Sequence, residues 1–77
     1  MYPIIRLPKF LRNDCLMKAW MDMAETISKE AARPEIDPTQ RYELLKTAGQ
    51  CIDKAAKAGG FLRTKDFLNW LETHENQ

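Results

Sequence analysis

The stretch "RPEIDPTQ", residues 33–40, decides the fold that we predict from this sequence. Pro34 disfavours helical geometry in the residue before it, so a helix that enters the stretch should end there. Asp37 is a good N-cap, Pro38 suits the first position of a helix, and Gln40 stands where a capping-box partner belongs. The stretch therefore predicts a turn between two helices, which we expect to pack as an antiparallel hairpin.

The helix before this turn is predicted to begin after the N-cap residue Asn13 and to end near Ala32. At about 100° per residue, its large apolar side chains form one narrow stripe: Leu16, Trp20, Met23 and Ile27. Four further apolar residues widen this stripe on one side: Ala24, Ala31, Met17 and Met21. We expect the resulting arc to face the core.

The helix after the turn is expected to end at Ala58, because Gly59 and Gly60 follow it. Its expected apolar face consists of Tyr42, Leu45, Ala48, Gly49, Ile52 and Ala56. Thr64 is the expected cap of a third helix, which is apolar through Phe67, Leu68, Trp70 and Leu71. Residues 73–77 are expected to be a frayed tail.

The composition agrees with a helical chain, since there is no valine and only three glycines among 77 residues. A chain of this length forms one domain, and its core alone rarely supplies more than about 3–5 kcal/mol. We therefore predict that residues 1–77 form a single all-α domain. The expected architecture is a small three-helix bundle, with residues 1–12 as an extended N-terminal arm packed on it.

The arm is apolar, basic and interrupted by Pro3 and Pro8. If it is extended like polyproline II, three cations point the same way, namely Arg6, Lys9 and Arg12. We expect its apolar side chains to pack on the helices, where they would enlarge a small core: Ile4, Ile5, Leu7 and Phe10. The alternative is that the arm docks on another chain, which could be a second copy of this one.

A second cluster of cations, without any acidic residue, lies in residues 54–65: Lys54, Lys57, Arg63 and Lys65. An antiparallel hairpin would bring it towards the arm and Lys18, so that one end of a chain with net charge +1 is basic. Such an end either binds an acidic protein or nucleic acid, or is only a solvated surface. Met17 and Met21 could likewise form a partner-binding patch or simply cover the arm and the third helix.

The sequence contains no constellation that predicts catalysis, so we expect no enzyme and no cofactor. The single histidine, His74, lies near the end of the chain, and there is no glycine-rich phosphate loop. No Cys-x-x-Cys pair exists, and the ligand spacing of a metal site is missing. Cys15 and Cys51 are expected to be free thiols, because a hairpin would place Cys51 nearer to Ala19.

We expect a cytoplasmic protein, because the sequence has no long apolar run and no signal-peptide pattern. The predicted function is a small non-catalytic protein–protein interaction module with a regulatory, adaptor or inhibitory role. Its expected partner is another protein with an acidic patch, or a second copy of the chain, and not a membrane. The alternative is a nucleic-acid-associated regulator that uses the basic end, whose binding would weaken steeply with salt.

Overall fold

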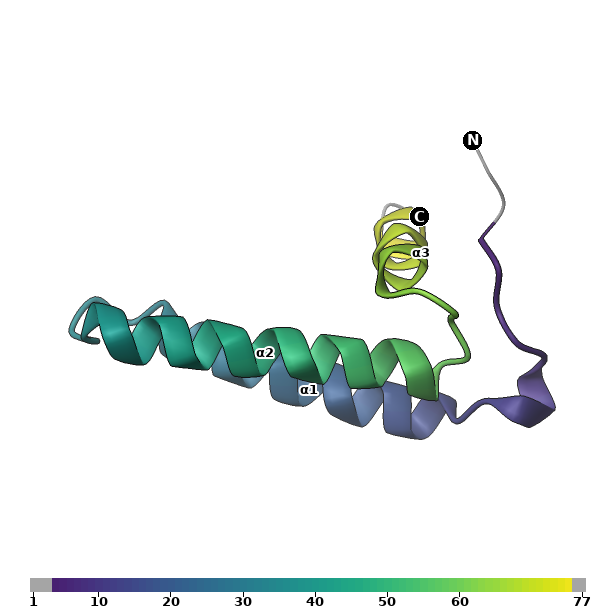
Figure 1. The fold of residues 1–77 in the computed structure, drawn as a ribbon, viewed down its shortest axis with the longest axis horizontal. Helices are drawn as coiled ribbons and strands as arrows, with labels where there is room; N and C mark the ends of the chain where they lie inside the picture. The colour runs from purple at the N-terminus through teal and green to yellow at the C-terminus, as the bar shows by residue number, and fades with distance from the viewer. Residues whose placement is uncertain (1–3, 76–77) are drawn as a thin grey trace.

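The computed structural model describes the backbone of residues 4–75 and the side chains of residues 4–73. Three α-helices follow a short 3-10 turn, η1 (Lys9–Leu11): α1 (Asp14–Ala31), α2 (Pro38–Ala58) and α3 (Thr64–Glu75). α1 and α2 lie side by side as a long hairpin, and α3 crosses one face of it (Figure 1). The predicted all-α fold, a small helical bundle with an N-terminal arm, is confirmed.

The ends of α1 and α2 lie where the sequence predicted them, although one predicted cap is wrong. The side chain of Asn13 accepts a hydrogen bond from the backbone nitrogen of Leu16 at 2.9 Å, as an N-cap should. Asp37 precedes α2 but its side chain makes no capping hydrogen bond. Because Pro38 lacks an N–H, one of the four unpaired donors at the start of a helix is absent there.

The start of α3 differs from the prediction. Thr64 is the first residue of the helix and not its cap, and its hydroxyl donates a hydrogen bond to Asp53 Oδ1 of α2 at 2.8 Å. α3 continues to Glu75, residues 76–77 lie outside the described part, and the frayed tail over residues 73–77 stays a prediction. The contact with Asp53 ties the start of α3 to α2.

The centre of the core lies where α3 meets the end of α2. Phe67 is completely buried, and its ring centroid lies 5.2 Å from that of Phe61 and 6.3 Å from that of Trp70. Ala55 and Ala56 of α2 complete this buried cluster. Partly buried apolar side chains surround it: Ile4, Met17, Trp20, Met21, Ile52, Trp70 and Leu71.

The packed face of α1 is one side of the apolar arc that the sequence predicted. Ala24 and Ala31, which lie on that side, are buried, whereas Leu16 and Met23 of the central stripe are 45% and 50% exposed. Small side chains at the contact let two helices approach closely, and larger side chains then flank it. The hairpin is therefore centred on alanines, and half of the predicted stripe remains open to solvent.

The packed face of α2 agrees with the predicted one only in part. Ala48 and Ala56 are buried as predicted, and Cys51 and Ala55 are buried beside them. Tyr42 and Leu45, which were expected in the core, are 65% and 51% exposed. They are exposed because α3 crosses only the later part of α2, near Ala56 and Phe61.

The arm is attached by its backbone and by Arg6 more than by its apolar side chains. Arg6 pairs with Phe61 as an isolated antiparallel bridge, and the nitrogen of Leu7 donates a hydrogen bond to the Gly60 carbonyl at 2.7 Å. Ile4 contacts the core as predicted. The prediction that other apolar arm residues are packed is wrong for Ile5, Leu7 and Phe10, which are 54%, 37% and 83% exposed.

Gly60 is the residue on which this attachment depends, because its φ of +82° lies in the left-handed region. A Cβ at Gly60 would also lie only 3.1 Å from the Cβ atoms of Leu7 and Arg12. We expect Gly60→Ala to lower the free energy of unfolding by about 1–2 kcal/mol in urea denaturation. Gly49→Ala is the matched control, since nothing lies within 4 Å of a Cβ there. Equal stability of the two variants would contradict this account of the arm.

Candidate functional site

Arg6 was predicted to be part of an exposed basic end, but the structure places it inside the fold. Its side chain is 16% exposed, its Nε donates to the Gly59 carbonyl at 2.8 Å, and its Nη2 donates to Asp14 Oδ1 at 3.0 Å. The guanidinium carbon lies 4.5 Å from the ring centroid of Phe61 and 4.8 Å from that of Trp70. Burial lowers the pKa of Arg6, as does nearby Arg12, while Asp14 opposes the shift.

Three other predicted cations also contact groups of the fold. Arg12 Nε lies 3.5 Å from Asp14 Oδ1, and the Nζ of Lys54 lies 4.7 Å above the ring of Trp20. Arg63 donates two hydrogen bonds, of 3.1 and 3.0 Å, to the carboxylate of Asp66, which is completely buried. The remaining predicted cations are exposed: Lys9, Lys18, Lys57 and Lys65.

The arm and the end of α2 do meet at one end of the molecule, as the hairpin predicted. The backbone nitrogen of Asn13 donates a hydrogen bond to the Ala58 carbonyl at 2.7 Å, which places the start of α1 beside the end of α2. The basic end is thus assembled in space. Because its arginines are engaged with Asp14, Asp66 and the aromatic rings, a large part of its charge holds the fold together.

Met17 and Met21 lie within the fold, in agreement with the structural interpretation of these residues. Both are half-buried and pack against the cluster around Phe67. The Sδ of Met17 lies 3.9 Å from Nη2 of Arg6 and directly beside Gly59, so it lines the attachment of the arm. Their role in binding a partner remains a prediction.

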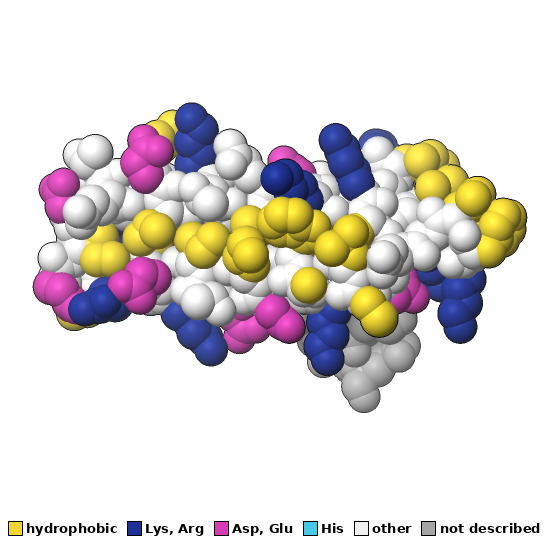
Figure 2. Space-filling model, turned by 90° about the horizontal axis from the view of Figure 1, so that it is seen from below, with side chains coloured by type: hydrophobic (Ala, Val, Ile, Leu, Met, Phe, Trp, Pro, Cys, Tyr) yellow, Lys and Arg dark blue, Asp and Glu magenta, His cyan; other side chains and the backbone are white. Residues whose placement is uncertain are grey.

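A row of hydrophobic side chains runs along the face of the hairpin that is turned away from α3 (Figure 2). We call the α1 residues that helical periodicity places on this face the open strip, and it consists of Leu16, Trp20, Met23 and Ile27. Trp20 lies at its edge, because it also packs against the buried cluster of Phe61 and Phe67. Trp20 and Ile27 are half-buried, and Leu16 and Met23 are about half exposed. The open strip is the stripe that periodicity identified, but it lies on the surface.

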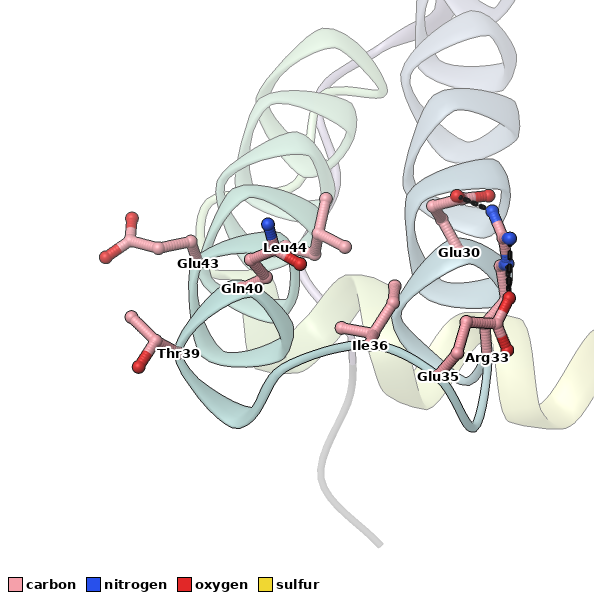
Figure 3. A pocket seen from close by; sticks show the side chains of 8 residues that line it. All are labelled: Glu30, Arg33, Glu35, Ile36, Thr39, Gln40, Glu43 and Leu44. Carbon is pink, nitrogen blue, oxygen red and sulfur yellow. Dashed lines mark hydrogen bonds and ion pairs between the residues drawn. The ribbon is translucent and has the colours of Figure 1, made fainter.

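A pocket of about 550 Å³ opens at the hairpin turn, between the end of α1 and the start of α2. Its lining consists of Glu30, Arg33, Glu35, Ile36, Thr39, Gln40, Glu43 and Leu44. Figure 3 shows Ile36 and Leu44 between the two helix ends, with polar side chains on either side of them. The turn pocket could not be predicted from the sequence, because its lining residues have no spacing that signals a site.

The turn pocket is acidic, because three carboxylates stand against one guanidinium, which leaves a net charge of −2. Arg33 forms ion pairs with Glu30 and Glu35 on the same side of the pocket. These two carboxylates, Glu30 first, raise the pKa of Arg33 above its ordinary value. No ion pair of Glu43 is found among the described residues.

The turn pocket and the open strip belong to the same face of the hairpin. Met23 of the strip and Glu30 of the pocket are seven residues apart on α1, which is nearly two helical turns. Glu43 of the pocket and Lys54, which covers Trp20, are eleven residues apart on α2, which is about three turns. We call the surface formed by the open strip, the turn pocket and Lys54 the open face.

We next considered metal ligands and thiols among the described residues outside the open face. They contain no group of three or more His, Cys, Asp or Glu side chains that could hold a metal ion. Cys15 is exposed and Cys51 is buried in the hairpin, and both are free thiols.

None of the helices in the described part is long and apolar enough to cross a membrane. Comparison of the chain with protein-family models, with curated proteins and with solved structures gave no match.

Proposed function

We propose that the protein is a small non-catalytic interaction module that binds another protein through its open face. The observation that carries this proposal is the open strip, in which Leu16 and Met23 are 45% and 50% exposed beside Trp20. A row of apolar side chains rimmed by charges is typical of a protein interaction site. Tryptophan and methionine are also enriched at such interfaces.

The core is small, so covering the open face would add substantially to the stability of the protein. Of the eight buried hydrophobic residues that the structure describes, five are alanines, and only Phe61 and Phe67 are large. Burying a Leu or Met side chain contributes about 1.5–3 kcal/mol. Covering the open strip would therefore add an amount comparable to the whole stability expected of such a core.

The predicted preference for an acidic partner fits one part of the open face. Lys54 lies over Trp20, so an acidic group of a partner that covers the strip would meet this ammonium. The nucleic-acid alternative depends on the basic end, where at least four of the eight predicted cations already contact groups of the fold. This engagement favours protein binding over nucleic-acid binding.

We expect the double substitution Leu16→Glu with Met23→Glu to abolish capture of protein from a lysate of the native host. Both residues are exposed, so the folded state should persist with a loss below about 1 kcal/mol. The matched control is Leu62→Glu with Leu68→Glu, which changes two similarly exposed leucines outside the open face. Wild type and control should retain the same proteins, and nuclease should not change the result.

Two outcomes would contradict this proposal. If the open-face variant captures as much protein as the control, the open strip is not the binding surface. If nuclease removes the captured material, or if capture falls steeply with salt through counterion release, the basic end is the functional part and nucleic acid is its ligand.

A further inference from the structure

We infer that the open face pairs with the open face of a second copy of this chain, in antiparallel orientation. The inference rests on the proposed function, because it names the partner of the same surface. The two ends of the molecule differ in a way that makes each complementary to the other. An antiparallel pair related by a two-fold axis makes the contact between the arm end and the turn end twice.

The turn end of the open face is acidic around an apolar floor. The turn pocket carries a net charge of −2, and Ile36 and Leu44 lie between its polar sides. In Figure 2, carboxylates lie on both sides of the hydrophobic row at this end. A ligand of the turn pocket should thus combine an apolar group with a positive charge.

The arm end of the molecule presents such a ligand. In η1, Phe10 is 83% exposed and Leu11 is 57% exposed, and the exposed Lys9 adjoins them. Lys54, whose Nζ lies over the ring of Trp20, adds a second positive charge to the open face. We assign η1 of one copy to the turn pocket of the other, with Phe10 against Ile36 and Leu44 and Lys9 beside the carboxylates.

Only the antiparallel orientation satisfies these contacts. A parallel pair would bring two acidic turn pockets together at one end and two basic arm ends together at the other. In the antiparallel pair, Leu16 of one copy lies over Ile27 of the other, so that the two open strips cover each other. The molecule measures 43 Å by 25 Å along its two longer axes, which is enough for the roughly 800 Å² per partner of a standard interface.

Charge reversal with mixing tests this arrangement. One variant carries Glu35→Lys and Glu43→Lys, which makes its turn pocket basic, and the other carries Lys9→Glu and Lys54→Glu, which reverses the two charges that would face the turn pocket of the other copy. Sedimentation equilibrium should give the wild type twice the monomer mass of 9.0 kDa. Each variant alone should dimerise at least ten-fold more weakly, and an equimolar mixture should recover the dimer, because each altered end meets an oppositely altered one.

Two single substitutions outside the open face, Lys18→Glu and Glu72→Lys, are the controls and should leave the dimer unchanged. A wild type that stays monomeric at millimolar concentration would overturn the inference, and so would a mixture that does not recover the dimer. The proposed function would survive either result if the Leu16→Glu, Met23→Glu variant still loses capture of a different protein. The proposed function would fail separately if the Leu16→Glu, Met23→Glu variant captured as much protein as the wild type does.

Discussion

Replacing Phe67 with alanine is expected to unfold most of the protein at 25 °C. Phe67 is completely buried and packs against Phe61 and Trp70 at centroid distances of 5.2 and 6.3 Å. Removing a buried phenylalanine side chain typically costs about 3–5 kcal/mol. This loss equals the whole free energy of unfolding that a core of this size usually supplies. The folded state would therefore no longer be favoured.

The neighbouring substitution Leu68→Ala is the matched control, because Leu68 lies on the same helix but is 47% exposed. It should cost less than about 1 kcal/mol. Urea denaturation followed by far-ultraviolet circular dichroism measures both effects. A Phe67→Ala protein that unfolds at the same urea concentration as Leu68→Ala would show that the aromatic cluster is not the centre of the core.

Arg6→Ala is expected to have the second largest effect, a loss of about 2–3 kcal/mol and release of the arm. The guanidinium contacts two aromatic rings, at about 0.5–2 kcal/mol for each such contact, and a charge-assisted hydrogen bond to Asp14 contributes about as much. Arg6→Lys should not restore stability, because an ammonium cannot lie flat on the rings of Phe61 and Trp70 while bonding to the Gly59 carbonyl.

Two control substitutions in the arm separate this account from one based on apolar packing. Ile5→Ala and Lys9→Ala change exposed residues on either side of Arg6 and should each cost less than about 0.5 kcal/mol. Deleting residues 1–10 should cost at least as much as Arg6→Ala. Amide hydrogen exchange at Leu7, whose nitrogen bonds to the Gly60 carbonyl, should become fast in Arg6→Ala. If exchange there stays slow, Arg6 does not hold the arm.

The helices could be located from the sequence because their ends depend on local chemistry. Asn13, Pro38 and the Gly59–Gly60 pair act within one helical turn of their own positions, and α1 and α2 begin and end beside them. Asp37 shows the limit of such reasoning. Its residue type suits a cap, but whether its side chain reaches a backbone nitrogen depends on the conformation of the whole turn.

The faces of the helices were harder to predict, because periodicity shows which residues share a face and not which face another helix covers. Leu16, Trp20, Met23 and Ile27 form a real stripe on α1. The hairpin instead packs on the neighbouring alanines, since close approach of the two backbones excludes larger side chains at the centre. The stripe therefore became the open strip, which is the main part of the candidate site.

The inward orientation of Arg6 could not be predicted, because the aromatic rings that hold it come from residues 61 and 70. The rule that arginines are solvated fails where planar rings and a carboxylate surround the guanidinium. The turn pocket was missed for a similar reason. Glu30, Glu35 and Glu43 lie on two helices and the turn between them, and only the folded hairpin brings them together.

Intermolecular paramagnetic broadening tests the central claim, that the open face binds and that its partner is a second copy. Cys15 is exposed at the arm end of α1 whereas Cys51 is buried, so a nitroxide can be attached to Cys15 alone. The labelled protein is mixed with ¹⁵N-labelled protein that carries Cys15→Ser, so any broadening arises between copies. We expect the amides of residues 33–44 around the turn pocket to broaden and those of α3 to stay sharp. Broadening that is absent at millimolar concentration, or that falls on α3 instead, would contradict the account.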